Sequence, residues 1–430
     1  MIEDNMTKRN ILVFPCGSEI GLNIYSSVRY STYFHLIGAS SVDDHGMFIY
    51  DDYIGNVPFI SDDAFIPTIK KIVREKNIVA IYPAMDKVIT FLKQHEEEIG
   101  CKIIAPKLET TEICLSKRKT YQVLHDTVLT PEIYNPSGVL EFPVFCKPNI
   151  GYGAIGTKVI NNASELKDFL ANKNDILTLE LLPGEEYTVD CFTDQGGRLL
   201  YCSARKRNRV KNGVSINTSF VDEQSEFEVI AKKINERISF RGAWFYQVKR
   251  NKYGKLCLLE IAARLGGSSL LSRAIGVNLA LLTLFDAFDY KVSVQTNSNY
   301  SVILDRVLSN NYIYKNLHYS KVYVDYDDCL ILDKTTVNAD LVKFLFKCIN
   351  EGKKVILLTK HAGELESELQ RFRLSGLFDE ILHISKEEKK SKYIDTKDSI
   401  FFDDSFAERV EVQNETGISV FSPEMVDVLL

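Results

Sequence analysis

The chain has 430 residues, of which 45% are hydrophobic and 26% are charged, and its formal net charge is −6. This length is too great for one hydrophobic core and predicts two or three domains. Residues 320–430 carry 22 acidic and 15 basic side chains, whereas the remainder of the chain has a net charge of +1. This distribution argues against nucleic acid as a partner, because no basic face is expected.

The nine cysteines are scattered without a C-x-x-C pair, and Cys146, Cys191 and Cys257 lie within apolar runs. Thiols in such runs are typical of buried positions in a reducing compartment. The sequence has no signal-peptide core, and its apolar stretches are too short to span a bilayer. We therefore expect a cytoplasmic protein that does not associate with a membrane.

Residues 1–110 are predicted to form a small doubly wound α/β domain, because strand and helix patterns alternate there. A turn at residues 17–21 and Asp86 lie where strands lead into helices. These positions can line a cleft, although structural roles in turns explain them equally well. The expected elements are a strand at 10–15, a helix that includes Ile24, Val28 and Phe34, a helix at 65–76, a strand at 78–83, a helix at 86–98 and a strand at 103–106.

A strand, a glycine-rich turn and a second strand are predicted within residues 142–160. Gly151, Gly153 and Gly156 permit sharp bends that direct backbone N–H groups toward phosphate oxygens, and Lys147 adds a positive charge beside them. The glycine spacing also fits a dinucleotide fingerprint, but that motif requires a helix directly after the turn. Here a strand follows, and the next helix is expected with Ser164 as its N-cap. A hairpin with a flexible tip is the alternative.

Charged residues gather on both sides of this hairpin. A helix starting at residue 116 carries Lys117, Arg118 and Lys119 in its first turn, which is unfavourable for the helix dipole unless an anion is near. A basic loop at 205–209 suits a γ-phosphate or an anionic substrate, and solvated surface positions are the alternative for both clusters. Acidic residues at 180, 185, 186 and 190 would need partners such as an adenine amino group or ribose hydroxyls, and Asp190 is open to a structural role.

Two apolar strands at 242–249 and 255–261 place Gln247 and Glu260 toward neighbouring strand ends, and Arg264 follows with a Gly-Gly-Ser turn. Glu260 is suited to hold Mg²⁺ between phosphates, since that cation prefers hard oxygen ligands. Arg264 is suited to stabilise charge on a transferring phosphoryl group. A simple internal ion pair is the alternative.

The order of these motifs resembles the ATP-grasp superfamily, in particular its carboxylate–amine ligase and carbamoyl-phosphate-synthetase-like branch, over residues 10 to about 300. The resemblance implies an ATP-grasp α+β domain at 111–307 that follows the pre-ATP-grasp domain at 1–110. It implies that ATP phosphorylates a small-molecule carboxylate and that an amine attacks the acyl phosphate, with release of ADP. The implied cofactors are ATP and Mg²⁺, with Mn²⁺ as a substitute.

The same resemblance assigns roles to individual residues. The family motif Glu-x-Asn-x-Arg reads Glu260-Ile-Ala-Ala-Arg264 here, so Ala262 removes one ligand of the usual second Mg²⁺. Gln247 also stands where many members have an acid. The implied roles are phosphate binding for Lys117 and Lys147, closure over the phosphates for Gly151, Gly153 and Gly156, base contacts for Glu180 and Leu182, a ribose contact for Glu186, metal binding for Gln247 and Glu260, and catalysis for Arg264.

After a linker at 308–319, residues 320–430 are predicted to form a Rossmann-like α/β domain. Strands at 321–330, 354–359 and 399–405 contain or end in polar side chains, which meet at one edge if the strands are parallel. Clustered carboxylates repel one another and therefore imply a cation, for which Mg²⁺ is the best candidate. A purely structural acidic edge is the alternative.

Residues 321–421 resemble the haloacid dehalogenase (HAD) phosphatase superfamily, with no cap domain or a minimal one. The resemblance implies that Asp325 is the nucleophile, that Asp327 is the general acid and base, and that Thr359 binds the phosphoryl group. It implies that Lys392, or as the lesser alternative Lys389, neutralises the charge of the phosphoryl group. It also implies that Asp325, Asp327, Asp403 and Asp404 bind the metal ion. Asp328 and Cys329 depart from the family pattern.

Together these patterns predict a ligase fused to a Mg²⁺-dependent phosphohydrolase that acts on a phosphorylated metabolite of the same pathway. The alternative is a catalytically reduced protein in which one domain binds nucleotide or senses phosphate. A homodimer is compatible with the sequence.

Overall fold

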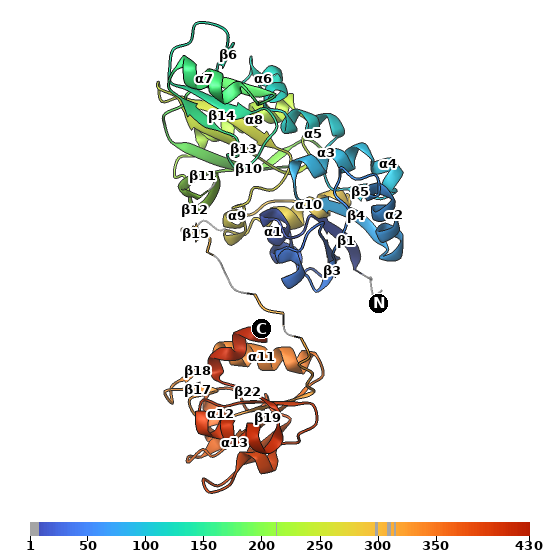
Figure 1. Cartoon of the computed structure of the whole chain (residues 1–430), viewed down its shortest axis with the longest axis vertical. Coiled ribbons are helices and arrows are strands. Elements are labelled where there is room, and N and C mark those ends of the chain that lie inside the picture. Colours follow the sequence, from blue (N-terminus) through green and yellow to red (C-terminus); the bar gives the residue numbers. More distant parts are fainter. Residues whose placement is uncertain (1–7, 212, 297–299, 308–310, 314) are drawn as a thin grey trace. The chain divides into compact units, whose positions relative to one another are not determined.

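The computed structural model describes residues 8–211, 213–296, 300–307, 311–313 and 315–430. The chain divides into two compact units, residues 1–308 and residues 309–430 (Figure 1). Within the described ranges, every helix falls short of the length and apolar character that a membrane crossing requires.

A five-stranded parallel sheet with the order β3-β2-β1-β4-β5 opens residues 1–308. Successive residues of β1 face opposite sides, so that Ile11 and Val13 enter one apolar core and Leu12 and Phe14 enter another. This arrangement agrees with the expected doubly wound sheet. Its elements are β1 (Arg9–Phe14), α1 (Glu19–Val28), β2 (Phe34–Ala39), the 3-10 helix η1 (His45–Phe48), β3 (Asp52–Ile54), α2 (Phe65–Glu75), β4 (Ile78–Pro83), α3 (Asp86–Gln94), α4 (Glu96–Ile99), β5 (Lys102–Ile103) and α5 (Leu108–Leu115).

The first helix ends earlier than the sequence pattern predicts. Helix α1 ends at Val28, and Phe34 is the first residue of β2 instead of a helical residue. The Ser31 hydroxyl accepts a hydrogen bond from the Phe34 N–H, and the Ser31 N–H donates to the Val28 carbonyl, so a turn separates the two elements. The apolar residue that appeared to continue the helix therefore packs in the core from a strand.

Two antiparallel sheets follow, with the orders β6-β9-β7-β8 and β14-β13-β10-β11-β12-β15. In Figure 1, α10 lies beside α1 and β4, so the last helix of this region returns to the first sheet. The elements are α6 (Lys117–Leu124), β6 (Ile133–Tyr134), β7 (Val144–Pro148), β8 (Lys158–Ile160), α7 (Ala163–Leu170), β9 (Ile176–Glu180), β10 (Glu186–Thr193), β11 (Leu199–Lys211), β12 (Val214–Phe220), α8 (Ser225–Arg237), β13 (Gly242–Arg250), β14 (Leu256–Ala262), α9 (Leu270–Ala274), α10 (Leu279–Ala287) and β15 (Ile303–Asp305).

The basic residues at 205–209, expected to form a loop, belong to the long strand β11, which pairs with both β10 and β12. Arg205 is buried, and its Nε donates to Asp190 Oδ2 at 2.7 Å. Asp190 thus has a structural ion pair. Lys206 and Arg209 are exposed, whereas the Arg207 side chain is only 7% exposed. Strand alternation separates Lys206 from Arg205 and Arg207, and a register shift of β11 follows between Arg207 and the exposed Arg209.

Trp244, the single tryptophan of the chain, lies on β13 of the larger antiparallel sheet and is buried in its apolar core. Its ring stacks on Phe240 with the ring centroids 4.1 Å apart and an interplanar angle of 7°. The indole Nε1 donates to Thr193 Oγ1 at 2.9 Å, so the buried polar edge of the ring has a partner.

Residues 309–430 contain a five-stranded parallel sheet with the order β20-β19-β16-β21-β22, consistent with a Rossmann-like domain. Strand β16 ends at Val324, earlier than predicted, so that Asp325 and Asp327 follow the strand. The elements are β16 (Lys321–Val324), β17 (Ile331–Leu332), β18 (Thr336–Val337), α11 (Ala339–Asn350), β19 (Lys354–Thr359), α12 (Leu365–Arg371), β20 (Glu380–His383), η2 (Lys390–Tyr393), β21 (Ser399–Phe402), α13 (Phe406–Thr416), β22 (Ser419–Phe421) and η3 (Pro423–Val428).

Candidate functional site

A pocket of about 380 Å³ is lined by residues from both antiparallel sheets and from the glycine-rich turn. Most of the residues that the sequence singled out for nucleotide binding meet there, although Gly156 and Arg264 are not part of its lining. Those that line it are Lys117, Lys147, Gly151, Gly153, Glu180, Leu182, Glu186, Gln247 and Glu260.

Lys147 is an almost fully buried ammonium at the end of β7. Its Nζ donates to the Tyr121 hydroxyl and to the Leu259 carbonyl, each at 2.9 Å. Burial lowers the pKa of Lys147 to about 7, Glu260 opposes this effect, and Lys117 adds to it. Because no carboxylate contacts Nζ among the described residues, an anion in the pocket would stabilise the charged form.

Lys117 is the residue of its helix turn that faces the pocket. Ser116 caps α6 by accepting from the Lys119 N–H, and Lys117 Nζ lies 3.4 Å from Glu260 Oε2. Arg118 and Lys119 instead form partly exposed pairs with Asp175 and Glu112. Of the three basic residues in the first turn of α6, Lys117 therefore lies at the pocket, whereas Arg118 and Lys119 lie at the surface.

The glycine-rich turn closes on itself through short-range hydrogen bonds. The Ile155 N–H donates to the Tyr152 carbonyl, and Gly153 adopts a φ of +60°, which favours glycine. Gly213, at the turn between β11 and β12, approaches it so closely that a Cβ there would lie 2.5 Å from the Gly153 carbonyl carbon. Two turns that are distant in sequence are thus packed together at the pocket.

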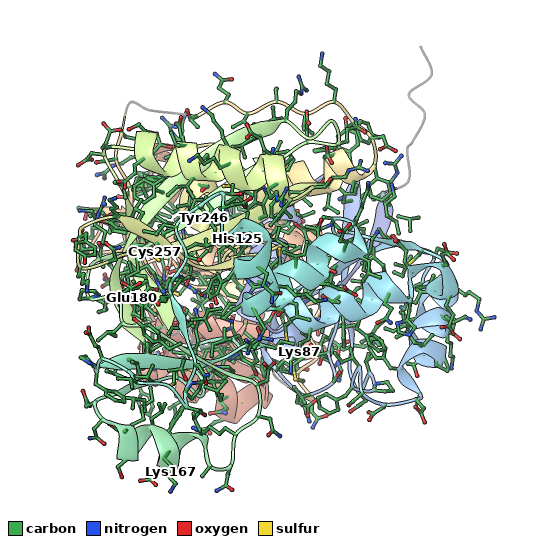
Figure 2. All side chains as sticks on the ribbon, turned by 90° about the horizontal axis from the view of Figure 1, so that it is seen from above. Lys87, His125, Lys167, Glu180, Tyr246 and Cys257 are labelled. Atoms are coloured by element: carbon green, nitrogen blue, oxygen red, sulfur yellow. The ribbon has the colours of Figure 1, made fainter. Side chains whose placement is uncertain are left out.

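Glu180 ends β9 at the pocket wall, and Figure 2 shows it near Cys257. Burial raises the pKa of the Cys257 thiol to about 12, and Glu180 raises it further, while Lys147 opposes the shift. Cys257 therefore remains protonated, which excludes a thiolate beside the proposed base contact.

Gln247 and Glu260 are direct neighbours in the register of β13 and β14. Glu260 offers a partly exposed carboxylate and Gln247 an amide oxygen, which together fit one Mg²⁺ ion. Ala262 is 5% exposed and pairs with Phe245, so this position adds no ligand atom.

Arg264 pairs with an acid at the start of helix α3. Its Nε and Nη2 donate to Asp86 Oδ1 and Oδ2 at 2.9 and 2.7 Å. The expected internal ion pair therefore exists, but its acid is Asp86, 178 residues earlier, and not Glu260. The pair connects the start of α3 with the chain that follows β14.

Arg207, one of the basic residues at 205–209 that the sequence suggested for a γ-phosphate or an anionic substrate, lines the same pocket. It forms an ion pair with Glu186, so the proposed ribose contact is already in contact with a cation. The alternation of β11 distinguishes Arg207 from Lys206, but Arg205 and Arg209 stand at the same alternate positions, so this signal alone does not select Arg207.

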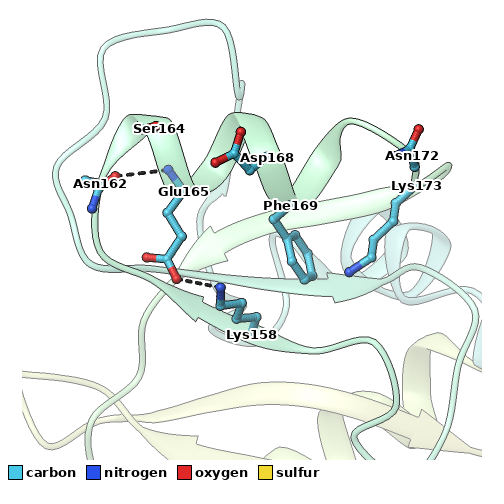
Figure 3. Close-up of a pocket in the computed structure, with 8 residues that line it drawn as sticks. All are labelled: Lys158, Asn162, Ser164, Glu165, Asp168, Phe169, Asn172 and Lys173. Atoms are coloured by element: carbon cyan, nitrogen blue, oxygen red, sulfur yellow. Dashed lines mark hydrogen bonds and ion pairs between the residues drawn. The ribbon is translucent and has the colours of Figure 1, made fainter.

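A second depression, shown in Figure 3, lies along α7 and shares no lining residue with the nucleotide pocket. Three of its polar groups already have partners: Asn162 Oδ1 accepts from the Glu165 N–H at 3.0 Å, and Lys158 Nζ lies 2.7 Å from Glu165 Oε1. Asn162 is therefore the N-cap of α7, in place of the predicted Ser164. We assign this depression no role.

In residues 309–430, carboxylates from two neighbouring strands meet at the carboxyl end of the sheet. Asp325, Asp403 and Asp404 each offer an oxygen atom, and these atoms lie within 4.8 Å of one another. Lys390 Nζ lies 2.6 Å from Asp325 Oδ1 and 2.7 Å from Asp403 Oδ2. Thr359, 1% exposed, ends β19 at the same sheet edge.

Protonation in this cluster is governed by burial. Burial and the charge of Asp325 raise the pKa of Asp403 to about 7, while Lys390 opposes the shift. Burial also raises the pKa of Asp325, again against Lys390. Burial lowers the pKa of Lys390, but the two carboxylates outweigh it, so the pKa lies above its ordinary value. These oxygen donors suit a cation such as Mg²⁺.

Two expected members of this cluster are placed differently. Lys392 is exposed, and the lysine between the carboxylates is Lys390, because the 3-10 helix η2 turns that side chain inward. Asp327 lies outside the group of metal-binding oxygens, and its Oδ2 is 2.9 Å from His361 Nδ1. Lys389, the lesser alternative, pairs at the surface with Glu415.

The two departures from the family pattern have structural roles. Asp328 has a φ of +49°, and its Oδ1 accepts from the Asp333 N–H at 3.1 Å, which is typical of a turn. Cys329 is fully buried, and burial raises its pKa well above the ordinary value.

Comparisons with known proteins assign the fold. A family model described as "ATP-grasp in the biosynthetic pathway with Ter operon" matches residues 172–306. Biotin carboxylase of Campylobacter jejuni, solved as a β-γ-ATP complex, is 18% identical, with 67% of this chain and 73% of that chain covered and a TM-score of 0.57. The chain thus has the ATP-grasp fold.

Two further solved structures support this fold. An L-amino acid ligase from Bacillus licheniformis is 16% identical, with 66% of this chain and 74% of that chain covered and a TM-score of 0.54. N5-carboxyaminoimidazole synthetase from Staphylococcus aureus, complexed with ADP, is 15% identical, with 71% and 84% covered and a TM-score of 0.57. No curated protein sequence matches the chain.

We predict that Lys390→Met destabilises residues 309–430, because it leaves two buried carboxylates without their cation. The expected loss is about 3–5 kcal/mol at pH 8, and it is smaller at pH 5, where carboxylates with a raised pKa bind protons. Hydrogen exchange of the amides in β16 and β21 would measure it. Lys392→Met is the matched control and should change protection by less than about 0.5 kcal/mol. Equal protection in both variants would contradict the assignment of Lys390.

Proposed function

We propose that residues 1–308 form an ATP-dependent, ADP-forming carboxylate–amine ligase. The observation that carries the proposal is the meeting of Lys117, Lys147 and Glu260 in one pocket beside a glycine-rich turn. Two buried ammonium groups favour a polyanion, and one carboxylate beside them favours a divalent cation. The ATP-grasp fold and the likeness to an L-amino acid ligase support the same reaction class.

In this proposal, Lys117 and Lys147 bind phosphate oxygens of ATP, and Glu180 and Leu182 line the pocket for the base. Glu260 and Gln247 would hold Mg²⁺, which when bound offsets negative charge on the phosphates. A substrate carboxylate oxygen attacks the γ-phosphorus, and the bond from that phosphorus to the bridging oxygen breaks, which releases ADP. An amine then attacks the acyl carbon, phosphate leaves, and the nitrogen loses a proton.

Arg264 has a different role from the catalytic one that its motif position implies, because its Nε and Nη2 both donate hydrogen bonds to the Asp86 carboxylate. We infer that it orients the chain after β14, and thereby Glu260, relative to the first sheet. The division into a domain at 1–110 and another at 111–307 is part of the same proposal. Helix α10, which belongs to the second of these regions, packs on residues of both.

The ligase proposal predicts a defined pair of products. The assay uses the Asp325→Asn protein, because Asp325 is the expected nucleophile of residues 309–430 and its loss should remove phosphatase background. Incubated with Mg-ATP and pooled amino acids and carboxylates, this protein should form ADP together with a product whose mass equals that of a dehydrated substrate pair. Chromatography with mass detection would measure both, and omission of ATP is the control. A second candidate, a nucleotide-binding switch without turnover, follows from the ligand-free side chain of Ala262. ATP that is bound but intact across all pools would favour the switch.

ATP affinity should fall as pH rises above about 7, because the lowered pKa of Lys147 removes its charge there. Bound phosphate restores the ammonium, so binding at pH 8 should take up a proton and weaken by up to about tenfold per pH unit. Calorimetry in two buffers with different ionisation enthalpies would measure the uptake. Lys147→Met should abolish it, and Lys119→Met, which changes a lysine paired with Glu112 at the surface of α6, should not. Binding without proton uptake at pH 8 would contradict this account.

We also propose that residues 309–430 form a HAD-type, Mg²⁺-dependent phosphohydrolase that acts on a phosphorylated metabolite of the same pathway. Asp325, Asp403, Asp404 and Lys390 support it, since a nucleophile beside a cation site suits phosphoryl transfer. Asp325 would attack the phosphorus while Asp327 protonates the leaving oxygen, and water would then release phosphate. Thr359 would bind the phosphoryl oxygens.

The phosphohydrolase proposal is tested with an aryl phosphate and Mg²⁺. The wild-type chain should release phosphate, Asp325→Asn should lose at least about 10²-fold in rate, and Asp404→Asn should raise the Mg²⁺ concentration needed. Asp333→Asn, in the following turn, is the control. Full activity in Asp325→Asn would refute the role of Asp325 as the nucleophile. If the wild-type chain hydrolyses neither aryl phosphate nor the substrates or product of the ligase, a phosphate-sensing module would be favoured.

A further inference from the structure

Arg207 is a buried cation with donor capacity left in the nucleotide pocket. Its side chain is 7% exposed, and it contacts Glu186 and the carbonyl of Gly213. Arg207 Nη1 also lies 3.4 Å from Gln247 Oε1. Its Nε is buried without a hydrogen-bond partner among the described residues. A buried donor of this kind is costly unless a ligand accepts from it.

The charges that line the pocket are unevenly balanced. Four cations, Lys117, Lys147, Arg207 and Lys249, line it together with three acids, Glu180, Glu186 and Glu260. Glu186 is paired with Arg207, and Glu180 lies on another strand, at the end of β9. Glu260 is thus the carboxylate beside the lysines, with the neutral Gln247 opposite it and the apolar Ala262 two residues further along β14.

This ligand set provides for one divalent cation. Mg²⁺ is held by hard oxygen ligands, usually one or two carboxylates together with phosphates and water. Glu260 and the Gln247 amide oxygen can serve one such ion. A second ion near Gln247 would lie beside the guanidinium of Arg207 and not beside another carboxylate, because Arg207 Nη1 is 3.4 Å from Gln247 Oε1. Two positive charges this close repel each other strongly in a buried site.

We propose that Arg207 binds the ATP phosphates directly and takes the place of a second divalent cation, so that the site holds one metal ion per nucleotide. This inference rests on the proposed ATP-dependent function of the same pocket. A guanidinium suits the role because it is planar, remains charged when buried and offers parallel donors to phosphate oxygens. The unpartnered Nε supplies one such donor beside an Nη group.

Metal stoichiometry tests the proposal without any need for turnover. The full chain would be titrated with Mn²⁺ in the presence and absence of saturating AMP-PNP, and free Mn²⁺ would be counted by electron paramagnetic resonance. The difference between the two titrations gives the Mn²⁺ bound with the nucleotide, so that an ion held by Asp325, Asp403 and Asp404 is not counted. We expect one Mn²⁺ per nucleotide in the wild type and in Gln247→Glu, because Arg207 neutralises the new carboxylate. The double variant Arg207→Gln/Gln247→Glu should bind two. The matched control, Arg209→Gln/Gln247→Glu, changes an exposed arginine of the same strand and should bind one.

A second readout is nucleotide affinity at fixed Mn²⁺. Arg207→Gln should weaken AMP-PNP binding on the order of tenfold or more, whereas Arg207→Lys should recover part of the loss. Unchanged Trp244 fluorescence would show that the sheet remains folded in each variant. Two Mn²⁺ ions per AMP-PNP in the wild type, or unaltered affinity in Arg207→Gln, would overturn the role of Arg207 and leave the ligase proposal standing. Failure of the wild type to bind AMP-PNP would overturn both.

Discussion

The burial of two lysine ammonium groups beside one partly exposed carboxylate is the constraint on which the nucleotide pocket depends. Lys147 reaches Tyr121 of α6 and the Leu259 carbonyl of β14, while Lys117 reaches Glu260. Each contact joins elements from different parts of the chain, so the pocket forms only when α6, β7 and β14 meet. Because burying charge without full compensation is costly, the assembled pocket retains a preference for an anion.

The carboxyl edge of the C-terminal sheet has the opposite imbalance. One lysine lies between two buried carboxylates, and a third carboxylate is close by. Lys390 keeps the cluster stable, and the remaining negative charge favours a further cation. The same physical rule thus favours an anion in the pocket of residues 1–308 and a cation at the sheet edge of residues 309–430.

Sequence patterns located most of the pocket because chemistry-bearing residues stand at the ends of regular elements. Lys147 ends a strand, Lys117 begins a helix, and Glu260 lies near the end of a strand; such ends meet in α/β and α+β folds. The errors arose where the decisive contact is not local. The choice of Lys390 over Lys392 depends on a single 3-10 turn, and the Asp86–Arg264 pair joins the start of α3 to the chain after β14, 178 residues later. The basic residues at 205–209 were expected to form a loop, so the sequence did not show that Arg207 is the one that lines the pocket.

The single tryptophan has a practical consequence for spectroscopy. Trp244 is buried, stacked on Phe240 and hydrogen-bonded to Thr193, in the same antiparallel sheet as Arg207 and Gln247. Residues 309–430 contain no tryptophan. Intrinsic fluorescence excited at the indole band therefore reports selectively on residues 1–308, so this unit can be followed in an intact chain without any attached label.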